Sequence, residues 1–261
     1  MKFRVVSDIH NEFYAQTDSF YQLPVMDGED KMCLILAGDI GLLHSPRTYA
    51  RLIDDLSKRF MYVFWIEGNH EYYHGNIDKH SIAGITYEWH NIHTRLLEFP
   101  EEKIVVLGCT LWSDFENGDP ISMLDANQRM NDFFIIRKGP EYSKFKAENA
   151  KALHHVQKRQ LFDQVERYKT LGYKVVVVTH HHPSFKGVSR DYIGDTLNGA
   201  YCSELFEDIQ RTGPDIWCCG HIHEHKTYMV ADTTVICNPL GYPWESTGFD
   251  SKYTFNLKNY D

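Results

Sequence analysis

Short runs of hydrophobic residues, rich in valine and isoleucine, recur along the chain, and a polar or glycine-containing cluster ends each of them. Runs of this length are typical of buried strands rather than of helices. Because the runs are continuous and do not alternate with polar residues, they predict strands that are covered on both faces. The predicted strands are Phe3–Val6, Met32–Ala37, Met61–Ile66, Ile104–Leu107, Tyr173–Val178 and Ile216–Cys219.

Longer segments with hydrophobic residues at helical spacing separate these strands. They predict helices at Ser45–Arg59, Pro120–Asn131, Tyr142–Leu171 and Tyr201–Arg211. Ser45 followed by Pro46 is typical of an N-cap with proline in the first turn. The segment Lys226–Cys237 predicts a β-hairpin that turns at Ala231 and Asp232. The remaining long segments are expected to form loops or short helices: Asn11–Asp30, His74–His93 and Ser184–Gly199.

The order of these elements, in which strands and helices alternate, indicates an α/β fold. No internal repeat, low-complexity tract or Gly/Ser-rich linker divides the 261 residues, so we expect a single domain over residues 1–261. Hydrophobic residues make up 43% of the chain and charged residues 24%, which are values of an ordinary globular protein. This composition argues against disorder.

The formal net charge is −9, which argues against an extended, non-specific nucleic-acid surface because such a surface needs clustered lysine and arginine. A phosphorylated substrate remains compatible with this charge, since bound metal ions supply local positive charge. We find no signal peptide after Met1 and no apolar stretch near the ~18 residues needed to span a membrane. We therefore expect a cytoplasmic protein.

The six cysteines contain no C-x-x-C pair, and several lie inside apolar runs. This pattern favours buried free thiols in a reducing compartment. Disulfides and a cysteine-ligated zinc site are the alternatives.

Candidate metal ligands follow five of the predicted strands. The motifs are Asp8-Ile9-His10, Gly38-Asp39, Gly68-Asn69-His70-Glu71, His180-His181-His182 and Gly220-His221-Ile222-His223. In an open sheet, ligands collect beyond the carboxyl ends of the strands. Strands that lie side by side would bring all five motifs into one crevice.

The spacing within two of these motifs supports a metal site. Asp8 and His10 lie two residues apart, so in extended geometry both side chains point the same way, and His221 and His223 repeat this arrangement. Nitrogen and oxygen donors suit Mn, Fe, Zn, Ni or Co, whereas the thiolates of a structural zinc site are missing from these motifs.

Each motif alone has an ordinary structural explanation. Asp8 is also a common turn residue, Gly38-Asp39 a common loop, and His180 to His182 an exposed tract or an adventitious metal site. His221-Ile222-His223 is compatible with a strand end that carries one core histidine. Their joint occurrence, each after an apolar run, favours one shared metal site.

The series Asp8-x-His10, Gly38-Asp39, Gly68-Asn69-His70-Glu71, His180 and Gly220-His221-x-His223 resembles the calcineurin-like metallophosphoesterase superfamily, over residues from about 3 to 240. The resemblance implies a four-layer sandwich of two mixed β-sheets flanked by helices. It also implies that Asp8, His10 and His223 bind one metal and that Asn69, His180 and His221 bind the other. Asp39 would bridge the two metals. Among the three consecutive histidines we prefer His180, because it follows the strand directly.

His70 would lie outside the metal shell and face the leaving group, as the resemblance implies. The chain departs from the protein Ser/Thr phosphatases of the superfamily, because Gly38-Asp39 continues with Ile40-Gly41-Leu42 and not with an Asp-Arg-Gly signature. The carboxylate that orients the histidine in that branch is not visible either. A protein phosphatase is therefore disfavoured, and another group is expected to orient His70.

These residues predict a binuclear metal-dependent phosphoesterase with two divalent ions, manganese being favoured and Fe, Zn, Ni or Co being alternatives. Two ions ~3.5–4 Å apart lower the pKa of a bridging water, and the resulting hydroxide would attack phosphorus while His70 protonates the leaving oxygen. The short chain leaves little room for a cap domain, so we expect a compact phosphate ester or nucleotide as substrate, and a phosphodiesterase. A phosphomonoesterase, a nuclease and a non-catalytic scaffold with this fold are the alternatives.

Overall fold

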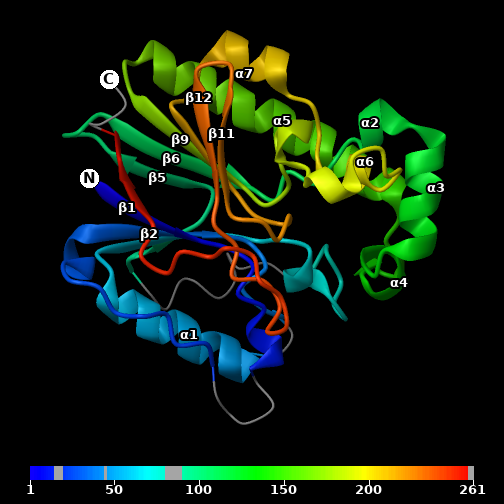
Figure 1. Ribbon diagram of the computed structural model, residues 1–261, viewed down its shortest axis with the longest axis horizontal. Coiled ribbons are helices and arrows are strands. Elements are labelled where there is room, and N and C mark those ends of the chain that lie inside the picture. The colour runs from blue at the N-terminus through cyan, green and yellow to red at the C-terminus, as the bar shows by residue number, and fades with distance from the viewer. Residues whose placement is uncertain (15–19, 44–45, 80–89, 258–261) are drawn as a thin grey trace.

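The computed structural model describes residues 1–14, 20–43, 46–79 and 90–257. Two large mixed sheets lie face to face in it, with helices on their outer sides (Figure 1). The first sheet has the strand order β13-β1-β2-β3-β4. Its parallel strands are β1 (Lys2–Val6), β2 (Met32–Ala37), β3 (Tyr62–Ile66) and β4 (Ile92–His93), and β13 (Thr254–Asn256) pairs antiparallel with β1.

The second sheet has the strand order β11-β12-β10-β9-β6-β5. Its central strands are parallel: β6 (Ile104–Cys109), β9 (Lys174–Thr179), β10 (Ile216–Cys219) and β12 (Thr233–Cys237). The two edge strands, β5 (Leu96–Phe99) and β11 (Lys226–Val230), are antiparallel to their neighbours. The predicted hairpin is therefore confirmed as β11 and β12, and all six predicted strands are present.

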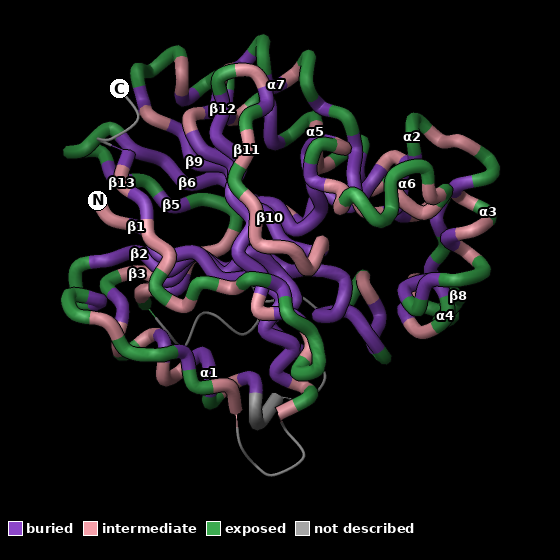
Figure 2. Tube along the Cα trace, viewed as in Figure 1, coloured by how far each residue is buried: buried purple, intermediate pink, exposed green. Residues whose placement is uncertain are grey.

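The core is divided into layers. Side chains of both sheets, such as Phe64 and Val178, form one buried cluster between the sheets. Helix α1 (Pro46–Arg59) packs on the outer face of the first sheet, and helices α5 (Ala147–Thr170) and α7 (Phe206–Thr212) pack on the second. Each buried aliphatic side chain contributes about 1.5–3 kcal/mol. Figure 2 shows the strands as the most buried part of the chain, and the predicted four-layer α/β sandwich is confirmed.

A small helical lobe lies beside the sandwich, at the right of Figure 1. Its elements are α2 (Phe115–Gly118), α3 (Pro120–Arg129), α4 (Asp132–Ile135), α6 (Asn198–Tyr201), β7 (Arg137–Lys138) and β8 (Ser143–Lys144). The lobe has its own hydrophobic cluster around Trp112, Phe133 and Phe145. Only α3 was predicted from the sequence, because the other elements are too short to show a periodic pattern.

Two predicted helices begin in the wrong place. The helix predicted at Tyr142–Leu171 starts only at Ala147, because Ser143 and Lys144 pair with β7. The helix predicted at Tyr201–Arg211 is interrupted, since Cys202 is extended and pairs with His182 in an isolated bridge before α7 begins. The predicted N-cap at Ser45 lies outside the described residues.

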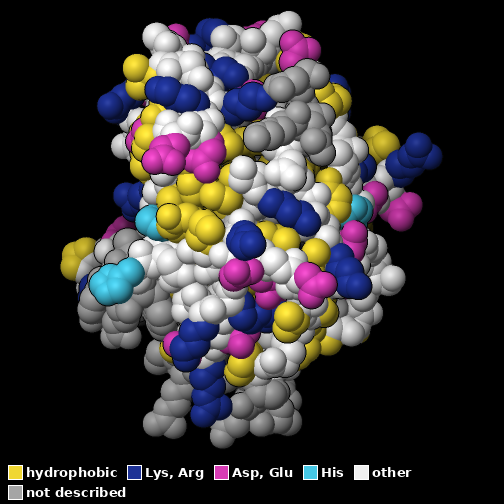
Figure 3. Space-filling model, turned by 90° about the vertical axis from the view of Figure 1, so that its left-hand side faces the viewer, with side chains coloured by type: hydrophobic (Ala, Val, Ile, Leu, Met, Phe, Trp, Pro, Cys, Tyr) yellow, Lys and Arg dark blue, Asp and Glu magenta, His cyan; other side chains and the backbone are white. Residues whose placement is uncertain are grey.

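Acidic, basic and hydrophobic side chains are interspersed on the face of the molecule that Figure 3 shows. Within the described residues, no helix has the length and apolarity needed to cross a membrane. All six cysteines are free thiols, as predicted, and Cys109 is the one that is not fully buried.

Candidate metal centre

The five ligand motifs meet where β1, β2, β3, β9 and β10 end. Four of the motif residues have a left-handed backbone: Asp8 (φ 52°), His10 (φ 48°), Asp39 (φ 54°) and His221 (φ 68°). Non-glycine residues rarely adopt this conformation, and such strain gathers at functional sites. The extended geometry that the spacing suggested for these motifs is therefore wrong. The turns still aim the side chains into one region, although His221 and His223 join different groups.

The first group consists of Asp8, His10 and His223. His223 Nε2 lies 3.4 Å from Asp8 Oδ1 and 3.2 Å from His10 Nε2. Ligands that share one cation at about 2.1 Å are spaced at about 3.0–3.4 Å, so the group fits a metal without large movement.

The second group consists of Asp39, His180 and His221, with Asn69 beside them. His180 Nε2 lies 2.9 Å from Asn69 Oδ1 and 3.4 Å from Asp39 Oδ2. His180 Nδ1 lies 3.0 Å from the carbonyl oxygen of Ala37, which fixes the ring so that Nε2 faces the group.

Asp39 lies between the two groups. Its Oδ2 is 3.4 Å from His180 Nε2 in the second group and 3.9 Å from His10 Nε2 in the first. The close approach depends on Gly68, because a Cβ there would collide with Asp39 and His180. The geometry thus puts one carboxylate within reach of both candidate cations.

Two buried ligand atoms support the presence of cations. Asp8 Oδ2 and His221 Nε2 have no hydrogen-bond partner among the described residues. An unpaired buried polar atom costs about 1–3 kcal/mol, and a bound cation would offset this cost. The seven side chains also supply only nitrogen and oxygen, as expected for Mn, Fe or Zn. The residues present therefore fit two divalent cations.

Charge pairs hold these side chains in place. Burial alone would lower the pKa of His180, but the Asp39 carboxylate raises it to about 10. Burial likewise acts to lower the pKa of His223, and the hydrogen bond with Asp8 raises it to about 9. The pKa of His221 lies well below its usual value because of burial and the neighbouring histidines. Burial lowers the pKa of His10 as well. Without metal, the centre therefore contains two ion pairs, His180 with Asp39 and His223 with Asp8, and two neutral imidazoles, those of His10 and His221.

Several supporting carboxylates were not predicted as site residues. Glu71 accepts hydrogen bonds from the backbone N–H groups of Asp39 and Gly68, at 2.9 Å and 2.7 Å, and so ties two ligand turns together. Asp132 accepts a hydrogen bond from Asn69 Nδ2 at 2.9 Å, which turns Asn69 Oδ1 toward His180. Asp132 lies 63 residues from Asn69 in the chain, so no spacing signal reveals it.

His70 begins a short 3₁₀ helix (His70–Tyr72) directly after Asn69. Its Nδ1 lies 2.9 Å from Glu12 Oε1, and the same oxygen lies 3.3 Å from His10 Nδ1. Burial alone would lower the pKa of His70, but Asp39 and Glu12 raise it. The sequence analysis found no carboxylate to orient His70, and the structure supplies Glu12. The sequence did place this carboxylate near the site, since Glu12 follows His10 by two residues.

His181 and His182 lie outside both groups. His181 packs against Trp112 and lies near the carbonyl oxygen of Thr110, at 3.3 Å from its Nδ1. His182 lies beside Cys219 and Tyr228. Of the three consecutive histidines, the structure brings only His180 to the convergent ligands.

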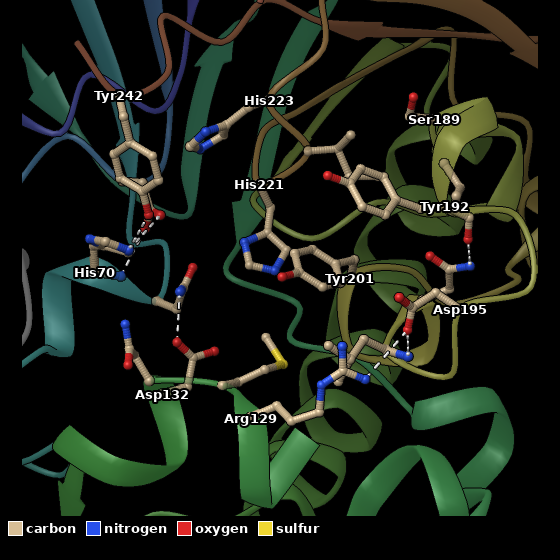
Figure 4. A pocket seen from close by; sticks show the side chains of 18 of the residues that line it. His70, Arg129, Asp132, Ser189, Tyr192, Asp195, Tyr201, His221, His223 and Tyr242 are labelled. Carbon is tan, nitrogen blue, oxygen red and sulfur yellow. Dashed lines mark hydrogen bonds and ion pairs between the residues drawn. The ribbon is translucent and has the colours of Figure 1, made fainter. Parts of the chain in front are cut away.

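A cavity of about 440 Å³ opens beside the centre, toward the helical lobe. In Figure 4, His70, His221 and His223 border it, the Tyr201 ring lies next to that of His221, and Tyr192 lies further toward the helical lobe. The rings of Tyr201 and His221 are stacked, with centroids 4.6 Å apart. Arg129 also lines the cavity, where it pairs with Asp125 and Asp195 at 3.5 Å and 3.8 Å. Four other basic side chains of nearby segments are not among its lining residues: Arg137, Lys138, Lys186 and Arg190.

A sandwich of two mixed sheets with nitrogen and oxygen ligands at the strand ends defines a metal-dependent hydrolase of the phosphoesterase type. The chain belongs to the calcineurin-like phosphoesterase family, whose model matches residues 1–225. It is accordingly a metal-dependent phosphoric ester hydrolase.

One relative is the uncharacterized protein L509 of Acanthamoeba polyphaga mimivirus, which is 25% identical over 275 residues, covering 95% of this chain and 93% of that protein. Among solved structures, a phosphopantetheinyl hydrolase from Mycobacterium tuberculosis is similar, with a TM-score of 0.68 at 18% identity. The match covers 93% of this chain and 90% of that one. A putative 5′-nucleotidase from Staphylococcus aureus matches with a TM-score of 0.50 at 15% identity, over 91% of this chain and 48% of its own. These structural likenesses establish the fold.

Proposed function

We propose that this chain is a binuclear phosphodiesterase that hydrolyses a small phosphate ester or nucleotide. In this proposal Asp8, His10 and His223 hold one divalent cation, Asn69, His180 and His221 hold the other, and Asp39 bridges them. The observation that carries it is the position of Asp39, whose Oδ2 lies within 4 Å of a histidine of each group. Manganese is the favoured ion, because the donors are oxygen and imidazole nitrogen.

Two bound divalent cations supply Lewis acidity, which offsets phosphoryl charge and lowers the pKa of water. The chain supplies the proton for the leaving oxygen. His70 Nδ1 donates to Glu12, so its Nε2 faces the cavity, 3.3 Å from the hydroxyl of Tyr242 and 4.0 Å from Asp39 Oδ2. A protonated Nε2 at this place can donate to the leaving group, and general acid catalysis of this kind contributes about 10²–10⁴-fold.

The cavity supports a compact substrate with groups on both sides of the phosphate. Its volume of about 440 Å³ lies in the range of ordinary small-molecule pockets. Tyr192 and Tyr201 offer aromatic surface in the cavity, Tyr201 next to the ligand His221, and Arg129 lines it while paired with Asp125 and Asp195 (Figure 4). A diester or nucleotide would place its phosphate at the centre and its second group against these residues.

The proposal is tested by metal analysis and paired turnover assays. We expect two Mn²⁺ per chain after loading, and faster hydrolysis of bis-p-nitrophenyl phosphate than of p-nitrophenyl phosphate. A chelator should abolish both activities. A preference for the monoester would identify a phosphomonoesterase instead, and a stoichiometry of one ion per chain would exclude the binuclear site.

We also propose that residues 1–261 act as one domain in the cytoplasm.

A further inference from the structure

A second group of metal-binding side chains lies away from the candidate centre, on residues that the proposed chemistry does not use. The ligand atoms of His182, Cys219 and Cys237 all lie within 4.8 Å of one another. All three residues are at most 1% exposed. Cys219 and Cys237 are paired residues at the ends of the neighbouring parallel strands β10 and β12, and His182 follows β9. The fold thus gathers one imidazole and two thiols from three strand ends.

We propose that His182, Cys219 and Cys237 form a thiolate site for Zn²⁺, separate from the two nitrogen and oxygen sites. Zn–S bonds of about 2.3 Å and Zn–N bonds of about 2.1 Å in a tetrahedron separate sulfur and nitrogen by about 3.6 Å. Cys219 Sγ lies 3.6 Å from His182 Nε2. The separation of these two atoms is therefore the one that a shared zinc ion requires.

The charges and the neighbouring groups suit this ion. Two thiolates and one neutral imidazole balance the charge of Zn²⁺, so the buried site carries no net charge. His182 Nδ1 lies 3.1 Å from the hydroxyl oxygen of Tyr228. Nδ1–H can donate to this oxygen, which leaves Nε2 free to bind metal, and zinc-ligating histidines usually have such a partner.

A third buried thiol, that of Cys202, lies in the same region, but its sulfur is not among the ligand atoms that lie within 4.8 Å of one another. Cys202 is fully buried, and it pairs with His182 in an isolated β-bridge. Other cysteines of the chain have different surroundings, because Cys33 and Cys218 pack among apolar residues between the two sheets. Those two behave as small hydrophobic side chains.

The location gives the site a structural role. His182 lies two residues after His180, and Cys219 lies two residues before His221. A zinc ion bound here would fix the ends of β9 and β10, which carry two ligands of the candidate centre. The inference does not rest on the proposed function, because it depends on a different set of side chains.

Cobalt substitution separates this site from the others. Co²⁺ bound by thiolates has an intense sulfur-to-metal charge-transfer absorption in the near ultraviolet, whereas Co²⁺ bound by nitrogen and oxygen does not. The protein is produced in cobalt-containing medium under reducing conditions, so that the buried site can load during folding. We expect the thiolate absorption in the wild-type protein and one equivalent of tightly held cobalt beyond what the nitrogen and oxygen ligands hold.

The variants Cys219→Ala and Cys237→Ala should lose this absorption, and the matched control Cys218→Ala should keep it. Cys218 lies on the same strand, but its side chain faces the core between the sheets. Wild-type protein that binds cobalt without the thiolate absorption would overturn the proposal, whether or not the variants fold. A Cys219–Cys237 disulfide in protein isolated without reductant, together with no cobalt–thiolate absorption after reduction, would overturn it as well.

Discussion

Glu12→Gln is the substitution that most directly tests how His70 is held. Glu12 Oε1 contacts Nδ1 of both His70 and His10, at 2.9 Å and 3.3 Å, and the Glu12 side chain is only 12% exposed. Glutamine keeps an oxygen at this place and can still accept from His70, but it removes the negative charge. The variant therefore changes the electrostatics of His70 and largely preserves its orientation.

The expected size of the effect follows from the hydrogen bond. A charge-assisted hydrogen bond contributes about 1.5–3 kcal/mol and a neutral one about 0.5–1.5 kcal/mol. Glu12→Gln should thus remove about 1.4 kcal/mol of stabilisation from the protonated imidazole, which lowers the pKa of His70 by about one. Above the new pKa, turnover of an ester with a poor leaving group should fall about tenfold. Glu12→Ala, which removes the contact itself, should cost more.

The assay compares aryl phosphate diesters whose leaving groups differ in pKa, at saturating Mn²⁺. Expulsion of a good leaving group needs no proton, so the loss in Glu12→Gln should be confined to poor leaving groups. Glu245→Gln is the matched control, because Glu245 contacts Nδ1 of His223 and does not touch His70. It should weaken metal binding without changing the leaving-group dependence. An equal loss on all esters in Glu12→Gln at saturating Mn²⁺, or a loss that appears only at limiting Mn²⁺, would refute the reasoning.

Three further predictions follow from the same centre. His70→Ala should slow turnover of esters with poor leaving groups by about 10²–10⁴-fold while two metals stay bound, and a wild-type rate would remove its role as an acid. Asp39→Asn should lower the metal content measured by elemental analysis, and an unchanged stoichiometry would contradict the bridging role. Metal binding at pH 7 should release about two protons, because the pKa values of His180 and His223 are about 10 and about 9 in the metal-free protein and a ligating nitrogen carries no proton. Calorimetry in buffers of different ionisation enthalpy measures this release, which should decrease above pH 9; heats that are independent of the buffer would argue against the two ion pairs.

The apolar runs were sufficient to predict the buried strands and the convergence of the residues that follow them, and the resemblance to the metallophosphoesterase superfamily implied the sandwich. Buried parallel strands are continuous apolar runs. The run Val175–Val178 predicts a strand rather than a helix because it is short and consists of β-branched residues. The residue that follows such a strand lies at the same edge of the sheet as the residues that follow the adjacent parallel strands. For this reason the position of His180 could be predicted without knowing a single contact.

Contacts between distant segments could not be predicted in this way. The helix expected at Tyr201–Arg211 is broken because Cys202 pairs with His182, and this pairing outweighs the local helical pattern. Asp132 reaches Asn69 from the helical lobe, whose elements are too short to be periodic. The backbone at Asp8 is left-handed, and Asp8 N–H donates to the carbonyl of Gly38, a contact that forms only when the two turns meet.

The candidate centre straddles the boundary between the two sheets, since Asp8, Asp39 and Asn69 follow strands of one sheet and His180 and His221 follow strands of the other. Neither sheet alone can assemble a complete set of ligands, so high-affinity metal uptake must wait until the sheets have docked. Bound metal would in turn oppose their separation. Metal affinity should then depend on side-chain packing far from the ligands. A substitution that leaves a cavity at Phe64, in the core between the sheets, should weaken metal binding.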